Sequence, residues 1–117
     1  LYKSFRFGNL FDLVMLDARS QRTEDPENIT YGATLSADEH YVFGETQRSW
    51  MLNELQTSQD DGVQWRILGT DDNFGQSAPP AALAGDVFFG TDNIEGYDAE
   101  RQIILDYIVD NGITNIV

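Results

Sequence analysis

The sequence contains no cysteine. This absence excludes a disulfide framework, a thiolate zinc site and a cysteine nucleophile. Long apolar runs are missing as well. Stretches such as 87–89 and 103–105 are far shorter than the ~20 residues that cross a bilayer, so no transmembrane segment is expected. With 117 residues, of which 41% are hydrophobic, the chain is long enough for one domain with a modest core.

Positive charge is scarce. One lysine, Lys3, and six arginines stand against 20 acidic residues, and the formal net charge is −13. A protein that neutralises nucleic-acid phosphates needs clustered cations, so we expect no nucleic-acid-binding patch. Halophilic proteins use acidic, lysine-poor surfaces of this kind, which stay soluble through like-charge repulsion. The composition fits a protein from a salt-adapted organism and one from an ordinary organism equally well.

Histidine is nearly absent too. His40 is the only one, so a histidine-rich metal site or a nucleophile–histidine pair would have to depend on it. It follows a polar stretch, where we expect a solvated side chain without a catalytic role.

Hydrophobic periodicity predicts an α/β fold in which helices pack on a sheet. Stretches that alternate in polarity or run apolar predict β-strands, and they cover residues 2–7, 10–16, 63–69 and 113–117. Apolar residues spaced three and four apart predict helices over 44–57 and 97–111, with Asp98 as the N-cap of the second. The residues expected in the core are Leu13, Met15, Trp50, Met51, Leu55, Trp65, Ile104 and Ile108.

The stretch 18–40 is polar and rich in turn residues, and we expect a long exposed loop there. Asn28, Ile29 and Thr30 match the glycosylation sequon, but so short a match arises often by chance, and we interpret it as ordinary loop. The chain begins at Leu1 without a signal segment and stops within the expected strand 113–117. We therefore expect 1–117 to be a single partial domain, an internal fragment of a larger one.

Polar residues follow two of the predicted strands, where α/β folds place their sites. Asp17 and Arg19 follow the strand 10–16, and either project into a common cleft or form an ordinary salt bridge that pins the loop. Asp71, Asp72 and Asn73 follow the strand 63–69. Their oxygens are ligands that a hard cation such as calcium prefers, but they lack the spacing of an EF-hand, and a solvated acidic turn is the more common meaning of such a cluster.

Four blocks of the sequence, taken in order, resemble the alkaline phosphatase D (PhoD-like) metallophosphatases. The first, S-F-x-x-G-x-L followed by L-D-x-R-x-x-R, covers residues 4–22. The second is similar to the helix L-G-x-x-Q-x-x-W-L-x-x-x-L, and the third to the strand W-K-V-L-G at 65–69. The last follows D-x-W-D-G-Y-P-A-E-R-Q and a later G-I. The matching residues of the second and last blocks are Gly44, Gln47, Trp50, Met51, Leu55, Asp92, Glu95, Gly96, Tyr97, Ala99, Glu100, Arg101, Gln102, Gly112 and Ile113.

The resemblance implies a fragment of a metallophosphatase-type β-sandwich flanked by helices. It also implies a secreted, cell-surface or periplasmic parent enzyme that hydrolyses phosphate esters with metal ions, of which calcium and iron are expected. The family's metal motifs lie on both sides of this region, so we expect the segment to need the remainder of the parent chain for activity. Its implied contribution is a phosphate-binding cation, Arg19 or second Arg22, held by Asp17.

The sequence also departs from the family pattern. Ala18, Ile94 and Asp98 replace the usual threonine, tryptophan and proline, and 70–75 replaces N-Q-V-x-F with a loop that carries two carboxylates. Near a metal these carboxylates would be ligands, whereas facing a phosphate they would repel it. The alternative function is a non-enzymatic acidic module that binds calcium, through Asp71 and Asp72, or a partner protein.

Overall fold

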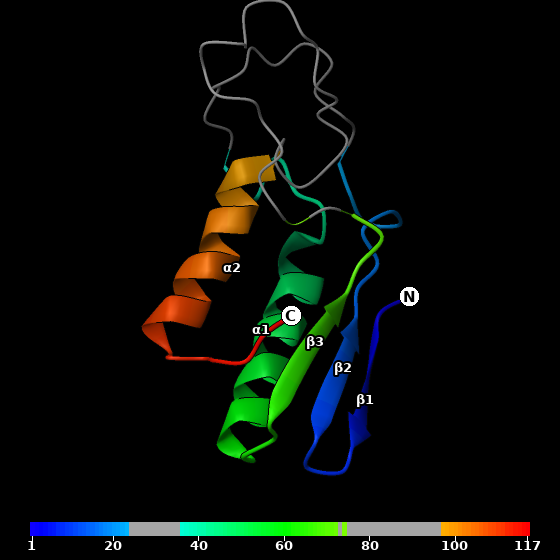
Figure 1. Cartoon of the computed structure of the whole chain (residues 1–117). Coiled ribbons are helices and arrows are strands. Elements are labelled where there is room, and N and C mark those ends of the chain that lie inside the picture. Colours follow the sequence, from blue (N-terminus) through cyan, green and yellow to red (C-terminus); the bar gives the residue numbers. More distant parts are fainter. Residues whose placement is uncertain (24–35, 73, 75–96) are drawn as a thin grey trace, which may run out of the picture.

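The computed structural model describes residues 1–23, 36–72, 74 and 97–117. A small sheet is covered on one face by two helices (Figure 1). The elements in chain order are β1 (Lys3–Phe7), β2 (Phe11–Met15), α1 (Gly44–Asp60), β3 (Trp65–Gly69) and α2 (Asp98–Asp110). The predicted α/β arrangement is confirmed. The sequon at 28–30 and the residues Asp92, Glu95 and Gly96 of the last motif block lie outside the described residues.

The sheet has the order β1-β2-β3. The first two predicted strands form an antiparallel hairpin, with Lys3 opposite Met15, and β3 runs parallel to β2 on its other side. The segment predicted as a strand over 113–117 is only partly one. It forms a single parallel bridge between Ile116 and Arg66, supported by a hydrogen bond from the Leu68 N–H to the Val117 carbonyl of 2.8 Å.

Both helices form close to their predicted bounds. Helix α1 begins at Gly44, whose φ is 73°. A side chain would be strained at this φ, and its Cβ would lie 3.1 Å from the Tyr41 ring, so the position favours glycine. The prediction that Asp98 caps α2 is wrong: the N-cap position is Tyr97, and neither helix has a side-chain cap from that position. Asp98 lies in the first turn instead, where its charge still complements the helix dipole.

The core lies between α1, α2 and the face of β2 that points toward the helices. Helix α1 packs on β2, and α2 packs on α1. As predicted, Met51, Leu55 and Ile104 are fully buried, while Trp50 and Ile108 are partly buried and pack against this core. Burial of side chains of this size contributes ~1.5–3 kcal/mol each.

Two core predictions are wrong. Met15 is 39% exposed and Trp65 is 41% exposed, and Leu13 is only half-buried. Successive side chains of a strand point to opposite faces of the sheet, and these residues point away from the helices. They belong to an apolar surface that we call the open face, which consists of Phe5, Phe7, Phe11, Leu13, Met15, Trp65 and Ile67.

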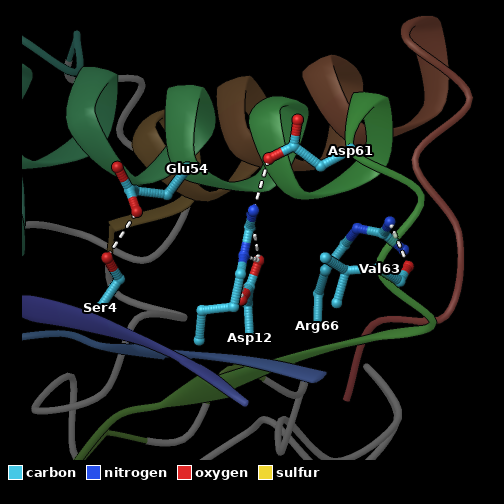
Figure 2. A network of polar contacts seen from close by, with 7 residues as sticks. Ser4, Asp12, Glu54, Asp61, Val63 and Arg66 are labelled. Carbon is cyan, nitrogen blue, oxygen red and sulfur yellow. Dashed lines mark hydrogen bonds and ion pairs between the residues drawn. The ribbon is translucent and has the colours of Figure 1, made fainter. Parts of the chain in front are cut away.

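The opposite face of the sheet, under α1, is partly polar (Figure 2). The Arg6 guanidinium donates two hydrogen bonds of 2.9 Å to the Asp12 carboxylate, which is 6% exposed, and one of 2.5 Å to Asp61 at the end of α1. Ser4 donates to Glu54 of α1 at 2.5 Å. These contacts fasten the β-hairpin to the helix through polar groups as well as through apolar packing.

Arg66 extends the polar layer to the C-terminal segment. Its guanidinium is buried and donates to the carbonyls of Val63 and Thr114, at 2.9 and 2.7 Å. Burial lowers the pKa of Arg66. Because this side chain of β3 bonds the segment that leads into β3 and also the segment after α2, it helps to fix the parallel course of residues 114–117 beside β3.

Asp12 gives a test of this polar layer. The Arg6 hydrogen bonds lower the pKa of Asp12 below its ordinary 3.8. A carboxyl group with a lower pKa in the folded state stabilises the fold above the unfolded-state pKa, and that contribution is lost as the pH falls through the folded value. We expect Asp12→Asn to lower the free energy of unfolding by about 2 kcal/mol at neutral pH and to weaken the loss of stability on acidification, measured by urea unfolding.

The control is Asp60→Asn, because Asp60 is exposed and bonds only Gln56 among the described residues. It should change stability by less than about 0.5 kcal/mol. Parallel stability curves for Asp12→Asn and the unchanged protein between neutral pH and about pH 3 would contradict the role of Asp12.

Candidate functional site

The carboxyl ends of β2 and β3 lie at the same edge of the sheet because the two strands are parallel. Asp17 and Arg19 follow β2 at this edge, and Asp71 and Asp72 follow β3. Both helices also begin at this end of the molecule (Figure 1). The two polar segments that the sequence analysis considered separately therefore meet, and we call this region the β2–β3 edge.

Asp17 has a structural task at this edge. Its carboxylate accepts hydrogen bonds from the backbone N–H groups of Arg19, at 3.2 Å, and Ser20, at 2.9 Å. The carboxylate thus holds the turn that presents the Arg19 side chain.

Gln47 fixes the backbone of Asp17 from below. This side chain of α1 is 1% exposed, accepts from the Asp17 N–H at 2.8 Å and donates to the Asp17 carbonyl at 3.0 Å. It therefore pairs with residue 17 as a neighbouring strand would. Sequence reasoning placed Gln47 on the helix stripe with Trp50 but did not predict this contact. The signal that could have indicated it is a glutamine on the apolar stripe of a helix, because a polar side chain that is buried there needs a hydrogen-bond partner.

The expected pairing of Asp17 with the Arg19 guanidinium is wrong. The Arg19 Nε donates instead to Asp71 Oδ2 at 3.1 Å, and both side chains are more than half exposed. The reason is geometric: Asp17 Oδ1 accepts from the backbone N–H groups of Arg19 and Ser20, whereas Asp71 lies across the parallel strand pair.

Arg22, the second predicted phosphate ligand, lies over a buried aromatic stack. Its guanidinium carbon is 5.5 Å from the centre of the Tyr97 ring, a cation–π distance. Tyr97 is 1% exposed, stacks on His40 at 4.0 Å and donates from its hydroxyl to the Thr23 carbonyl at 3.1 Å. The prediction that His40 is solvated is wrong, because His40 is 6% exposed and its Nδ1 lies 3.1 Å from Thr23 Oγ1.

A buried ion pair joins the two helices beside this stack. Glu100 of α2 is fully buried, and its carboxylate accepts from the N–H groups of Val42 and Phe43, at 2.6 and 3.0 Å. It also accepts from Arg48 of α1 at 3.1 Å. The N-cap residue of α1 provides no side-chain hydrogen bond. Glu100 of α2 instead supplies the anionic partner for the N-terminus of α1.

The described residues do not form a metal site by themselves. Within 1–23, 36–72, 74 and 97–117, no group of three or more histidine or acidic side chains converges in a way that could hold a metal ion. Asp71, one of the two weak candidates, is paired with Arg19. No helix of the described part of the chain is long and apolar enough to cross a membrane.

An α/β segment that presents an arginine at the carboxyl edge of parallel strands suits proteins that bind anionic groups. The chain belongs to the PhoD-like phosphatase family, whose sequence model matches residues 1–117. It is 28% identical over 127 residues to alkaline phosphatase D of Bacillus subtilis (strain 168), a match that covers 100% of this chain and 20% of that protein. It is also similar to the solved structure of PhoD, with a TM-score of 0.68 and 28% identity over 99% of this chain and 22% of that one. The chain thus spans about a fifth of the length of the relatives that it matches.

Glu100 gives a test of how the helices are held at this end. Glu100→Gln removes the charge that balances Arg48, whose side chain is only 9% exposed. We expect it to lower the free energy of unfolding by about 3 kcal/mol, because a buried cation is left without its anion. The measurement is urea unfolding at neutral pH.

The control for a general loss of charge is Glu54→Gln. It should cost less than about 1 kcal/mol because, among the residues that the structure describes, Glu54 accepts only from Ser4, in an exposed contact. The double variant Arg48→Met with Glu100→Gln should recover part of the loss. Equal stabilities of Glu100→Gln and the unchanged protein would show that the pair does not hold the helices.

Proposed function

We propose that this chain is a segment of a metal-dependent phosphoric ester hydrolase, an alkaline phosphatase or phosphodiesterase, in which Arg19 binds an oxygen of the substrate phosphate. The observation that carries the proposal is the placement of Arg19: an exposed guanidinium at the carboxyl edge of parallel strands, within a block of sequence that resembles the family. Planar guanidinium donors match the geometry of phosphate oxygens.

Several contacts support a fixed position for this arginine. Asp17 holds the backbone N–H groups of residues 19 and 20, and Gln47 holds residue 17 on both of its backbone groups. A guanidinium held in place before the substrate binds stabilises charge that develops on a phosphate oxygen without reorganising. Arg22, over the Tyr97 ring, is the second candidate for such a contact.

Metal ions would polarise the phosphoryl group in the whole enzyme. The described residues provide no cluster for them, so their ligands are proposed to lie elsewhere in the parent chain, and calcium and iron stay proposals from the family resemblance. A secreted, cell-surface or periplasmic location of the parent enzyme is likewise a proposal from the family resemblance. The described residues contribute the cation and the scaffold around it.

The open face supports the view that the chain is part of a larger fold. Phe5 is 47% exposed and Phe7 50%, and they share this face with Met15 and Trp65. A contiguous apolar surface of this kind usually marks an interface. We propose that a second sheet of the parent enzyme packs on this face and completes the β-sandwich, so that the predicted core positions Met15 and Trp65 are buried there.

The alternative, an acidic calcium-binding module, has less support. It needs Asp71 and Asp72 as ligands, but the Asp71 carboxylate bonds Arg19, and a cation beside an arginine is disfavoured.

Arg19→Ala in the full-length enzyme tests the proposal. If the guanidinium binds an oxygen that gains charge in the transition state, kcat/KM for a phosphate ester should fall by about 100-fold, an effect of about 3 kcal/mol. The melting temperature should change little, because an exposed ion pair contributes less than about 1 kcal/mol. Steady-state kinetics and thermal unfolding of the same preparation measure both.

A further variant serves as a control. Arg19→Lys keeps the charge but loses the planar donor fork, and we expect an intermediate kcat/KM. A fully active but destabilised Arg19→Ala enzyme would remove Arg19 from the site.

A further inference from the structure

The contact between Arg19 and Asp71 puts a negative charge beside the proposed phosphate ligand. The two residues are 52 positions apart in the sequence and meet because they follow neighbouring parallel strands. The Nε–Oδ2 distance is 3.1 Å, and the side chains are 65% and 51% exposed. An exposed ion pair of this kind is weak, so it does not by itself explain why a carboxylate lies here.

The hydrogen bond leaves most of the guanidinium available. Only Nε bonds Asp71, and the two terminal nitrogens of Arg19 make no hydrogen bond with any other residue of the described part of the chain. An arginine has five N–H donors, four of them on those terminal nitrogens. Arg19 can therefore bind a phosphate oxygen through its terminal nitrogens while Asp71 stays on Nε.

In that arrangement the carboxylate and the phosphate share one guanidinium and lie close to each other. Their repulsion grows in proportion to the charge of the substrate. A fully ionised phosphate monoester carries nearly two negative charges, whereas a phosphodiester carries one. The monoester is therefore repelled about twice as strongly as the diester.

We propose that Asp71 is a specificity-determining residue that disfavours doubly charged phosphate monoesters relative to singly charged phosphodiesters at this site. The inference rests on the proposed function, since it requires that Arg19 binds the substrate phosphate. Asp71 would thus influence which substrate is used, in addition to contacting Arg19, which binds the phosphate.

The test compares kcat/KM for p-nitrophenyl phosphate and for bis(p-nitrophenyl) phosphate in the full-length enzyme and in Asp71→Asn. Both substrates release the same leaving group and differ in charge. We expect Asp71→Asn to raise the monoester-to-diester ratio of kcat/KM about fivefold at low salt. The gain should shrink in about 1 M salt, where the Debye length is near 3 Å.

Three further variants make the outcome decisive. Asp71→Glu keeps the charge and should keep the original ratio, and Asp71→Ser should raise the ratio as Asp71→Asn does, which guards against a folding defect of one variant. Asp110→Asn removes an exposed carboxylate from the other end of the molecule, where α2 ends, and should leave the ratio unchanged (Figure 1).

A ratio that Asp71→Asn leaves unchanged, whether both rate constants stay the same or fall together, would overturn the inference. Arg19→Ala separates this failure from that of the proposed function. If Arg19→Ala lowers kcat/KM for both substrates while the ratio of Asp71→Asn is unchanged, only the role of Asp71 is wrong. If Arg19→Ala has no effect, the phosphate does not bind at Arg19 and both proposals are wrong.

Discussion

The parallel pairing of β2 with β3 is the constraint on which the candidate site depends. Parallel strands end at the same edge, so the turn after β2 and the turn after β3 lie side by side although some 50 residues separate them. The backbone of residue 17 is then locked by Gln47, and Glu100 closes the start of α1. Residues from three of the family-like blocks, 17, 47 and 100, make these contacts, which gives a physical reason for their occurring together in one sequence.

The two faces of the sheet are unusual in their polarity. Under α1 lie Asp12 and Arg66 (Figure 2). The Asp12 carboxylate is paired with Arg6, and the terminal nitrogens of Arg66 donate to the carbonyls of Val63 and Thr114. The open face carries the large apolar side chains. Burying charges costs desolvation energy unless their hydrogen bonds are complete, and exposing aromatic residues forfeits the hydrophobic contribution. Both features are consistent with a sheet that is an inner layer of a larger molecule.

Local patterns were sufficient to predict the helices and the first three strands, because periodicity reports directly on which face of an element is buried. The same patterns do not tell which face of a strand meets a helix. Trp65 and Met15 fit the alternating pattern of their strands, yet their side chains lie on the face of the sheet that points away from α1. The α/β rule marked the segments after the strands as candidate sites. It did not predict that the two segments meet or which partners Asp17 and Asp71 have, because Asp17 is occupied by nearby N–H groups and Asp71 reaches Arg19 only through the parallel pairing of β2 with β3.

The claim that the β2–β3 edge binds phosphate through Arg19 is tested most directly by a crystal structure of the full-length enzyme with inorganic phosphate bound. The account predicts a phosphate oxygen about 3 Å from a terminal nitrogen of Arg19, with Asp71 still on Nε and the open face covered by a second sheet. A phosphate bound away from this edge, with Arg19 directed into solvent, would contradict it.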